Sequence, residues 1–159
     1  MTSGRLLRLA TASECGSLSA LALRSKAYWG YDPVFLQACR GELTVDPRAA
    51  AAGRVVVLVE ADTPVGFYAL SPGERPDEAE ISLLFVEPAA IGRGIGRALW
   101  EHAVAKARAQ GLKRLKILSD PFALGFYRAV GATLSGKVRS PVRAPDGSER
   151  CLPVLHFEL

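Results

Sequence analysis

The chain has 159 residues, of which 49% are hydrophobic and 23% are charged. That length and composition are typical of a globular protein, so we expect a single domain over residues 1–159. No run of about 18 apolar residues is present, which argues against a membrane-spanning helix. No signal-like apolar segment follows the first residues, so we expect a cytoplasmic protein.

The formal net charge is +4 and the pI calculated from the sequence is about 9.2. The positive charge is spread along the chain, which suits a phosphate-bearing ligand and argues against a nucleic-acid partner. Cys15, Cys39 and Cys151 lack C-x-x-C spacing, and His102 and His156 have no nearby acid or cysteine at ligand spacing. We therefore expect no metal site, and a catalytic Cys–His pair has no local support.

Periodicity and capping residues predict a mixed α/β architecture with helices on both faces of the sheet. Apolar or alternating runs predict strands at residues 5–10, 54–60, 65–70, 112–118, 132–140 and 151–159, and another that begins at Glu80. Helices are expected from Thr11 or Ser13 to near Gly30, from Asp32-Pro33 to near Gly41, from Ile95 to Gly111, and from Asp120-Pro121 through Ala129. The helix from Ile95 should bury its residues at i, i+4 spacing, namely Ile95, Leu99, Ala103 and Ala107. The strand–helix–strand unit around it implies a right-handed parallel crossover.

A glycine-rich loop, Gly92-Arg93-Gly94-Ile95-Gly96-Arg97, joins the strand from Glu80 to the long helix. Glycines at alternate positions let backbone N–H groups converge, because no Cβ blocks the approach. The helix behind the loop adds unpaired N–H groups and the positive end of its dipole. This combination predicts an anion cradle for phosphate or pyrophosphate, with an ordinary glycine turn as the alternative.

Two familiar phosphate-binding loops fit less well. The stretch lacks the Gly-Lys-Ser/Thr of a P-loop. As a dinucleotide-binding motif it would place Leu99 at the third small position, where close helix–strand packing requires glycine or alanine. Asp120 after the next strand is the feature that favours a dinucleotide, and the spacing argues against it.

Two motifs between residues 80 and 132 resemble the GNAT superfamily of CoA-dependent N-acetyltransferases. The family's loop, Gln/Arg-x-x-Gly-x-Gly/Ala, falls on residues 91–96, with Ile91 in the first position. The segment from Asp120 to Ala132 is similar to the family's Asn-x-x-Ala-x-x-Phe-Tyr-x-x-x-Gly-Phe, with Asp120 and Ala132 in place of Asn and Phe. The resemblance implies a mixed, mostly antiparallel sheet with a central splayed pair of parallel strands.

The same resemblance implies acetyl-CoA as cosubstrate. Its pyrophosphate would bind the loop backbone with help from the charge of Arg93 or Arg97, and its pantetheine arm would follow the strand. A backbone N–H near Val86 would stabilise the oxyanion. The cofactor-binding residues expected on this basis are Phe85, Val86, Ile91, Gly92, Arg93, Gly94, Ile95, Gly96, Arg97, Asp120 and Phe126.

Two ionisable side chains are the candidate catalysts. Tyr127 occupies the family's position for the acid that protonates the departing thiolate, and a phenol is protonated at neutral pH. Glu80 occupies the start of the strand, where some members hold a base that acts directly or through water. Glu87 is the weaker candidate for the base. The alternatives are a core tyrosine and a solvated acid at a strand end.

The acceptor is expected to be a small-molecule or peptide amine that attacks the thioester directly in a ternary complex. Three aromatic residues lie at a helix break, namely Tyr28, Trp29 and Tyr31. We expect them to line the acceptor site together with Arg150. The alternative is that they pack at one end of the core. Two other functions stay open: a non-catalytic acyl-CoA-binding or regulatory module, and an acetylating toxin directed at tRNA. A homodimer also stays open.

Overall fold

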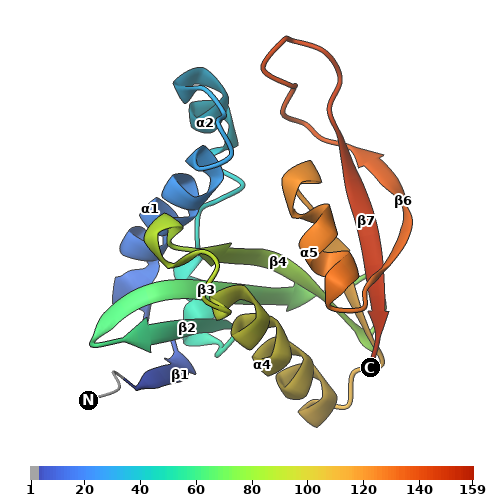
Figure 1. Ribbon diagram of the computed structural model, residues 1–159. Coiled ribbons are helices and arrows are strands. Elements are labelled where there is room, and N and C mark those ends of the chain that lie inside the picture. The colour runs from blue at the N-terminus through green and yellow to red at the C-terminus, as the bar shows by residue number, and fades with distance from the viewer. Residues whose placement is uncertain (1–3) are drawn as a thin grey trace.

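The computed structural model describes residues 4–159, which form one seven-stranded sheet with helices on both faces (Figure 1). The strands are β1 (Arg5–Leu9), β2 (Val55–Glu60), β3 (Thr63–Pro72), β4 (Glu78–Val86), β5 (Arg114–Leu118), β6 (Thr133–Arg139) and β7 (Cys151–Glu158). Their order across the sheet is β1-β2-β3-β4-β5-β7-β6. Every neighbouring pair is antiparallel except β4 and β5. The expected fold class is confirmed.

Helices cover the two faces of the sheet from different parts of the chain. The α-helices are α1 (Cys15–Ala27), α2 (Pro33–Cys39), α3 (Pro47–Ala51), α4 (Ile95–Ala109) and α5 (Leu124–Ala129), and the short 3-10 segments are Ala12–Glu14, Pro88–Ala90 and Pro121–Ala123. The first three helices pack on one face, and α4 and α5 pack on the other (Figure 1). Among residues 4–159, no helix is long and apolar enough to cross a membrane.

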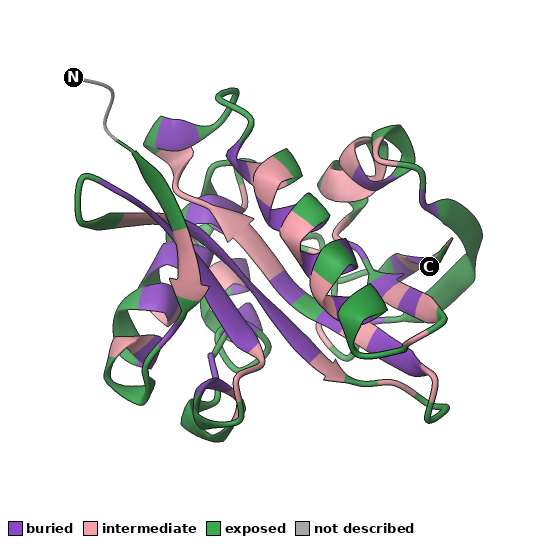
Figure 2. Ribbon diagram, turned by 90° about the horizontal axis from the view of Figure 1, so that it is seen from below, coloured by how far each residue is buried: buried purple, intermediate pink, exposed green. Residues whose placement is uncertain are grey.

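Strand β2 shows why the core has two layers. All six of its residues are buried, as expected for a strand covered on both faces (Figure 2). Because side chains alternate along a strand, Val55 and Val57 enter the cluster beneath α1, whereas Val56 enters the cluster beneath α4.

Helix α4 buries the residues that its periodicity predicted. Ile95, Leu99, Ala103 and Ala107 are each at most 1% exposed. The helix ends before Gly111, whose φ of +76° is a conformation that favours glycine. The predicted helix and its stop are confirmed.

The parallel strands β4 and β5 separate part-way along their length. They pair from Glu78 opposite Arg114 to Ile81 opposite Ile117, and the pairing ends there. Beyond this point β4 continues to Val86 with only β3 beside it. The splayed pair is therefore confirmed, and it leaves one edge of β4 open.

A β-bulge accompanies the separation. Ala69 of β3 faces Leu83, whereas the next residue, Leu70, faces Ile81, so Ser82 is an extra residue in β4. Bulges bend a strand and increase its twist, which turns the end of β4 away from β5.

Two local features differ from expectation. Helix α3 was not predicted, although Asp46-Pro47 carries the same cap signal as Asp32-Pro33, and the Asp46 side chain accepts from the Arg48 N–H. The helix expected from Asp120 through Ala129 is divided into a 3-10 turn and α5. A helix of so few residues gains little from propagation, so tertiary contacts decide its geometry.

Candidate active site

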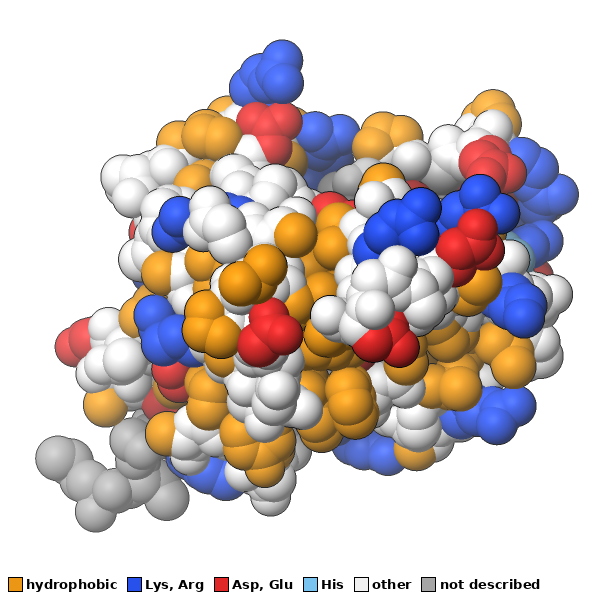
Figure 3. Space-filling model, turned by 90° about the horizontal axis from the view of Figure 1, so that it is seen from above, with side chains coloured by type: hydrophobic (Ala, Val, Ile, Leu, Met, Phe, Trp, Pro, Cys, Tyr) orange, Lys and Arg blue, Asp and Glu red, His pale blue; other side chains and the backbone are white. Residues whose placement is uncertain are grey.

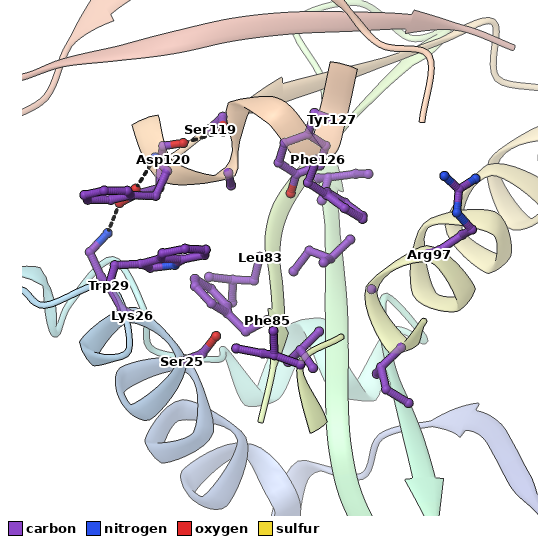
Figure 4. Close-up of a pocket in the computed structure, with 18 of the residues that line it drawn as sticks. Ser25, Lys26, Trp29, Leu83, Phe85, Arg97, Ser119, Asp120, Phe126 and Tyr127 are labelled. Atoms are coloured by element: carbon purple, nitrogen blue, oxygen red, sulfur yellow. Dashed lines mark hydrogen bonds and ion pairs between the residues drawn. The ribbon is translucent and has the colours of Figure 1, made fainter. Parts of the chain in front are cut away.

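A cavity of about 490 Å³ opens where β4 and β5 diverge. Its walls come from the end of α1, residues 81–86 of β4, the glycine loop with the start of α4, and residues 118–127 (Figure 4). Segments far apart in the chain therefore share one site. Its position at the splay explains its shape, because the sheet supplies no neighbouring strand there.

The glycine loop forms one end of this cavity. Gly92 and Gly94 have φ values of +85° and +78°, and Gly94 is the residue immediately before α4. A Cβ at Gly96 would lie 3.3 Å from the ring of Phe126, which also lines the cavity. The absent side chains leave the backbone open at the positive end of a 15-residue helix. The loop therefore suits a phosphate or pyrophosphate group.

The two arginines of the loop have different positions. Arg97 lines the cavity and rises from the first turn of α4 (Figure 4). The structure does not place Arg93 at the cavity, because its guanidinium donates to Glu60 Oε1 at 2.7 Å. The Arg93 carbonyl in turn accepts from Arg5 Nη2 at 2.6 Å. Of the two predicted cations, only Arg97 can face a ligand in the cavity.

The open edge of β4 supplies backbone groups to the cavity. The Glu87 N–H donates to the Val65 carbonyl at 2.8 Å. Because hydrogen-bonded and non-hydrogen-bonded pairs alternate along an antiparallel ladder, the N–H groups of Val86 and Leu84 then face away from β3. They therefore point toward the open edge of β4. The side chain of Phe85 also lines the cavity.

Tyr127, on α5, is buried in the wall of the same cavity. It is 5% exposed, lines the cavity, and makes edge-on contacts with Trp100 and Phe126. Figure 4 shows its ring and that of Phe126 on the opposite side of the cavity from Leu83 and Phe85. Burial raises the pKa of the Tyr127 phenol, so this group is protonated at neutral pH.

Glu80 lies one residue before the part of β4 that lines the cavity. It pairs in register with Lys116 of β5. Burial raises the pKa of Glu80, and Glu78 and Glu74 raise it further while Lys116 opposes the shift. Glu80 therefore exchanges its proton at a higher pH than an ordinary glutamate, and it does not itself line the cavity.

Of the three aromatic residues predicted to contact the acceptor, Trp29 lines the cavity and the other two do not. Trp29 lines the cavity and stacks on Phe122, with ring centroids 5.4 Å apart and planes 1° apart. Tyr28 is 54% exposed and packs edge-on against Trp29, and neither Tyr28 nor Tyr31 lines the cavity. Seen from above, hydrophobic side chains gather in the hollow between the two sides of the molecule (Figure 3).

Asp120 is the centre of a polar cluster at the end of the cavity that Trp29 lines. Its carboxylate accepts from Lys26 Nζ at 2.9 Å, Arg150 Nη2 at 3.0 Å and the Tyr31 hydroxyl at 3.1 Å. It also caps the turn that follows by accepting from the Phe122 N–H. Burial alone would raise the pKa of Asp120, but the Lys26 charge and these hydrogen bonds outweigh burial and lower it.

Sequence reasoning missed Lys26, Ser25 and Phe122 as cavity residues. A signal for Lys26 was present, because it continues the buried stripe of α1 four positions after Ala22. A lysine on an apolar stripe needs a partner, and the sequence does not say which.

No group of three or more His, Cys, Asp and Glu side chains could hold a metal ion within residues 4–159.

Comparison with known proteins decides the family. The signature of the Acetyltransferase (GNAT) family matches residues 22–132. The chain belongs to this family. The match runs from the second half of α1 to just beyond α5, so it includes the glycine loop, the splayed strands and Tyr127.

Two curated relatives match this GNAT chain over part of their length. The chain is 34% identical over 86 residues to the chloroplastic serotonin N-acetyltransferase 2 of Oryza sativa subsp. japonica, covering 54% of this chain and 38% of that protein. It is 37% identical over 82 residues to the peptidyl-lysine N-acetyltransferase YjaB of Salmonella typhimurium, covering 52% and 51%. The matched segments thus span about half or less of each relative.

Solved structures extend the fold similarity to nearly the whole GNAT chain. The PaiA N-acetyltransferase from Thermoplasma acidophilum, crystallised with coenzyme A, superposes with a TM-score of 0.74 at 16% identity over 98% of this chain and 99% of that one. YncA from Salmonella typhimurium, solved with acetyl-CoA, gives a TM-score of 0.74 at 16% identity over 99% and 95%. At these identities the similarity concerns the fold.

Proposed function

We propose that this GNAT protein transfers the acetyl group of acetyl-CoA to a primary amine by direct attack in a ternary complex. The observation that carries the proposal is the single cavity that joins the glycine loop, the open edge of β4 and Tyr127. Each of these parts supplies one requirement of acyl transfer: an anion site, donors for an oxyanion and a protonated acid. The GNAT match supports the same reaction class.

The proposed role of each residue follows from its position in the cavity. The loop from Gly92 to Gly96 and Arg97 hold the diphosphate of CoA, and Phe85 and Val86 lie beside its pantetheine arm. The Val86 N–H stabilises the charge that develops on the thioester oxygen. Tyr127 donates its proton to the departing thiolate.

The base is the second part of the proposal. An amine must lose its ammonium proton before it attacks, and Glu80 accepts that proton through a water molecule. Support comes from the raised pKa of Glu80 and its position next to Ile81, the first β4 residue of the cavity.

The proposal is tested by measuring thiol release from acetyl-CoA with a panel of amines that includes amino acids, arylalkylamines and lysine peptides. Release that depends on an amine supports the transfer reaction. Initial-rate plots that intersect support direct attack, whereas parallel lines would indicate an acetylated enzyme. Binding of CoA by calorimetry without release for any amine would identify a non-catalytic acyl-CoA-binding module.

A further inference from the structure

The end of the cavity that is lined by Lys26, Trp29 and Asp120 carries an excess of positive charge. The carboxylate of Asp120 is shared by two cations, Lys26 and Arg150, at 2.9 Å and 3.0 Å. The side chains of Lys26 and Arg150 are 7% and 6% exposed. Two buried cations and one carboxylate leave one positive charge without a protein counter-ion in this cluster, which is costly away from water.

The carboxylate of Asp120 has no free lone-pair position with which to bind a substrate. A carboxylate offers about four lone-pair positions. Oδ2 of Asp120 accepts from Lys26 and Arg150, and Oδ1 accepts from the Phe122 N–H. The Tyr31 hydroxyl is shared between the two oxygens, at 3.2 Å from Oδ1 and 3.1 Å from Oδ2. Asp120 therefore cannot also bind the ammonium group of an incoming ligand.

Lys26 has donors to spare. An ammonium group carries three N–H donors. Within residues 4–159, Asp120 is the one hydrogen-bond acceptor of Lys26 Nζ, which also lies 5.3 Å and 5.8 Å from the ring centroids of Tyr31 and Phe35. Lys26 lines the cavity beside Trp29 and Ser25, and Figure 4 shows its ammonium at the Asp120 end. Arg150 sits behind this wall and is held against the Phe35 ring and Ser140.

We propose that the acceptor is an amine that also carries a carboxylate, of which free amino acids are the simplest, and that Lys26 binds that carboxylate. The assignment rests on the proposed acetyl transfer and names its substrate class. Asp120 orients the Lys26 ammonium, and Arg150 keeps Asp120 engaged. The stacked rings of Trp29 and Phe122 at the rim suit an apolar or aromatic side chain on the same molecule.

The test compares acceptors that differ only in the carboxylate. Phenylalanine, phenylalaninamide and 2-phenylethylamine are assayed for thiol release, with the same comparison for leucine and methionine. A charge-assisted hydrogen bond is worth about 1.5–3 kcal/mol, so kcat/KM for the acid should exceed that for the amide by about 10- to 100-fold. The amine of the amide loses its proton more readily, so amine basicity alone would give the opposite preference.

Variants then assign the preference to a residue. In Lys26→Met the ratio of acid to amide should fall to one or below, because amine basicity alone favours the amide. Lys106→Met is the matched control, because Lys106 of α4 donates to the Gly53 carbonyl and does not line the cavity. It should keep the wild-type ratio. Calorimetry with CoA shows whether each variant is folded, and we expect affinities within about twofold of wild type.

The outcomes separate this inference from the proposed function. Acetylation of amides and amines as fast as acids overturns the inference and leaves acetyl transfer standing. A preference for acids that survives in folded Lys26→Met overturns the role of Lys26. CoA binding with no thiol release for any amine overturns both. A wild-type preference that is lost in Lys26→Met and kept in Lys106→Met supports the assignment.

Discussion

The guanidinium of Arg93 donates to Glu60 Oε1 at 2.7 Å and thereby ties the glycine loop to the end of β2. Arg5 of β1 adds a second tie, because it donates to Glu60 Oε2 at 2.9 Å and to the Arg93 carbonyl. The arginine that the sequence offers as a phosphate ligand thus holds the loop in place, and the anion site depends on contacts made outside the cavity.

Replacing Glu60 should therefore weaken CoA binding although Glu60 does not line the cavity. Glu60→Gln removes both ion pairs, and we expect the dissociation constant for CoA to rise about twofold to fivefold, as for partly exposed pairs. Calorimetry measures the change. Glu74→Gln is the control, because Glu74 pairs with Lys116 away from the loop. Equal effects of the two substitutions would exclude a specific role for Glu60.

The left-handed conformation of Gly94 should be required for CoA binding. In Gly94→Ala the new Cβ meets no atom closer than 4.0 Å, so the cost is backbone strain of roughly 1–2 kcal/mol. The loop will relax away from its conformation, and affinity for CoA should fall about tenfold.

Gly111→Ala is a matched control for Gly94. Gly111 has nearly the same φ, +76°, and its Cβ would meet nothing within 4 Å, but it follows the far end of α4. Both substitutions should lower the melting temperature, and only Gly94→Ala should weaken CoA binding. A loss of affinity in Gly111→Ala would mean that general destabilisation explains the effect.

Tyr127→Phe should lower kcat by about 10- to 1000-fold while CoA affinity changes little, because only the proton donor is removed. Stopped-flow thiol release and calorimetry give the two values. Tyr68→Phe is the control, because Tyr68 is fully buried and its hydroxyl contacts His102 rather than the cavity. An unchanged kcat in Tyr127→Phe would remove this tyrosine from the reaction.

The role of Glu80 should appear in the pH profile. A carboxyl group accepts a proton only when ionised, and burial raises the pKa of Glu80. Activity should therefore be lost as pH falls through that raised pKa, at a higher pH than about 4.3, the ordinary value for glutamate. Glu80→Gln should abolish this acidic limb and lower kcat/KM by about 100-fold.

Measurement of kcat/KM against pH with one acceptor tests this role. Deprotonation of the acceptor amine gives a separate rise of kcat/KM at higher pH. The wild type and Glu80→Gln should share this rise. Glu101→Gln, at an exposed position on α4, should keep the wild-type profile. An acidic limb that persists in Glu80→Gln would assign it to another group.

Local sequence patterns sufficed where neighbouring residues decide the structure. The apolar period of α4 identified its buried face, because residues four apart lie on one side of a helix. The Asp120-Pro121 pair predicted the start of a helix, and Asp120 accepts from the Phe122 N–H as a cap should, although the segment divides into a 3-10 turn and α5. The glycine loop was recognisable for the same reason, since its conformation depends on the missing side chains of the loop itself.

The sequence by itself therefore determined the GNAT architecture and the glycine loop, and it singled out Tyr127. Only the tertiary structure decided which charges meet, because Lys26 and Asp120 are 94 positions apart and come together only when α1 packs on β4. The position of the glycine loop beside the end of β2 likewise brings Arg93 to Glu60, whereas Arg97 lines the cavity. A charged side chain takes its function from its partner, and the partner is chosen by the fold.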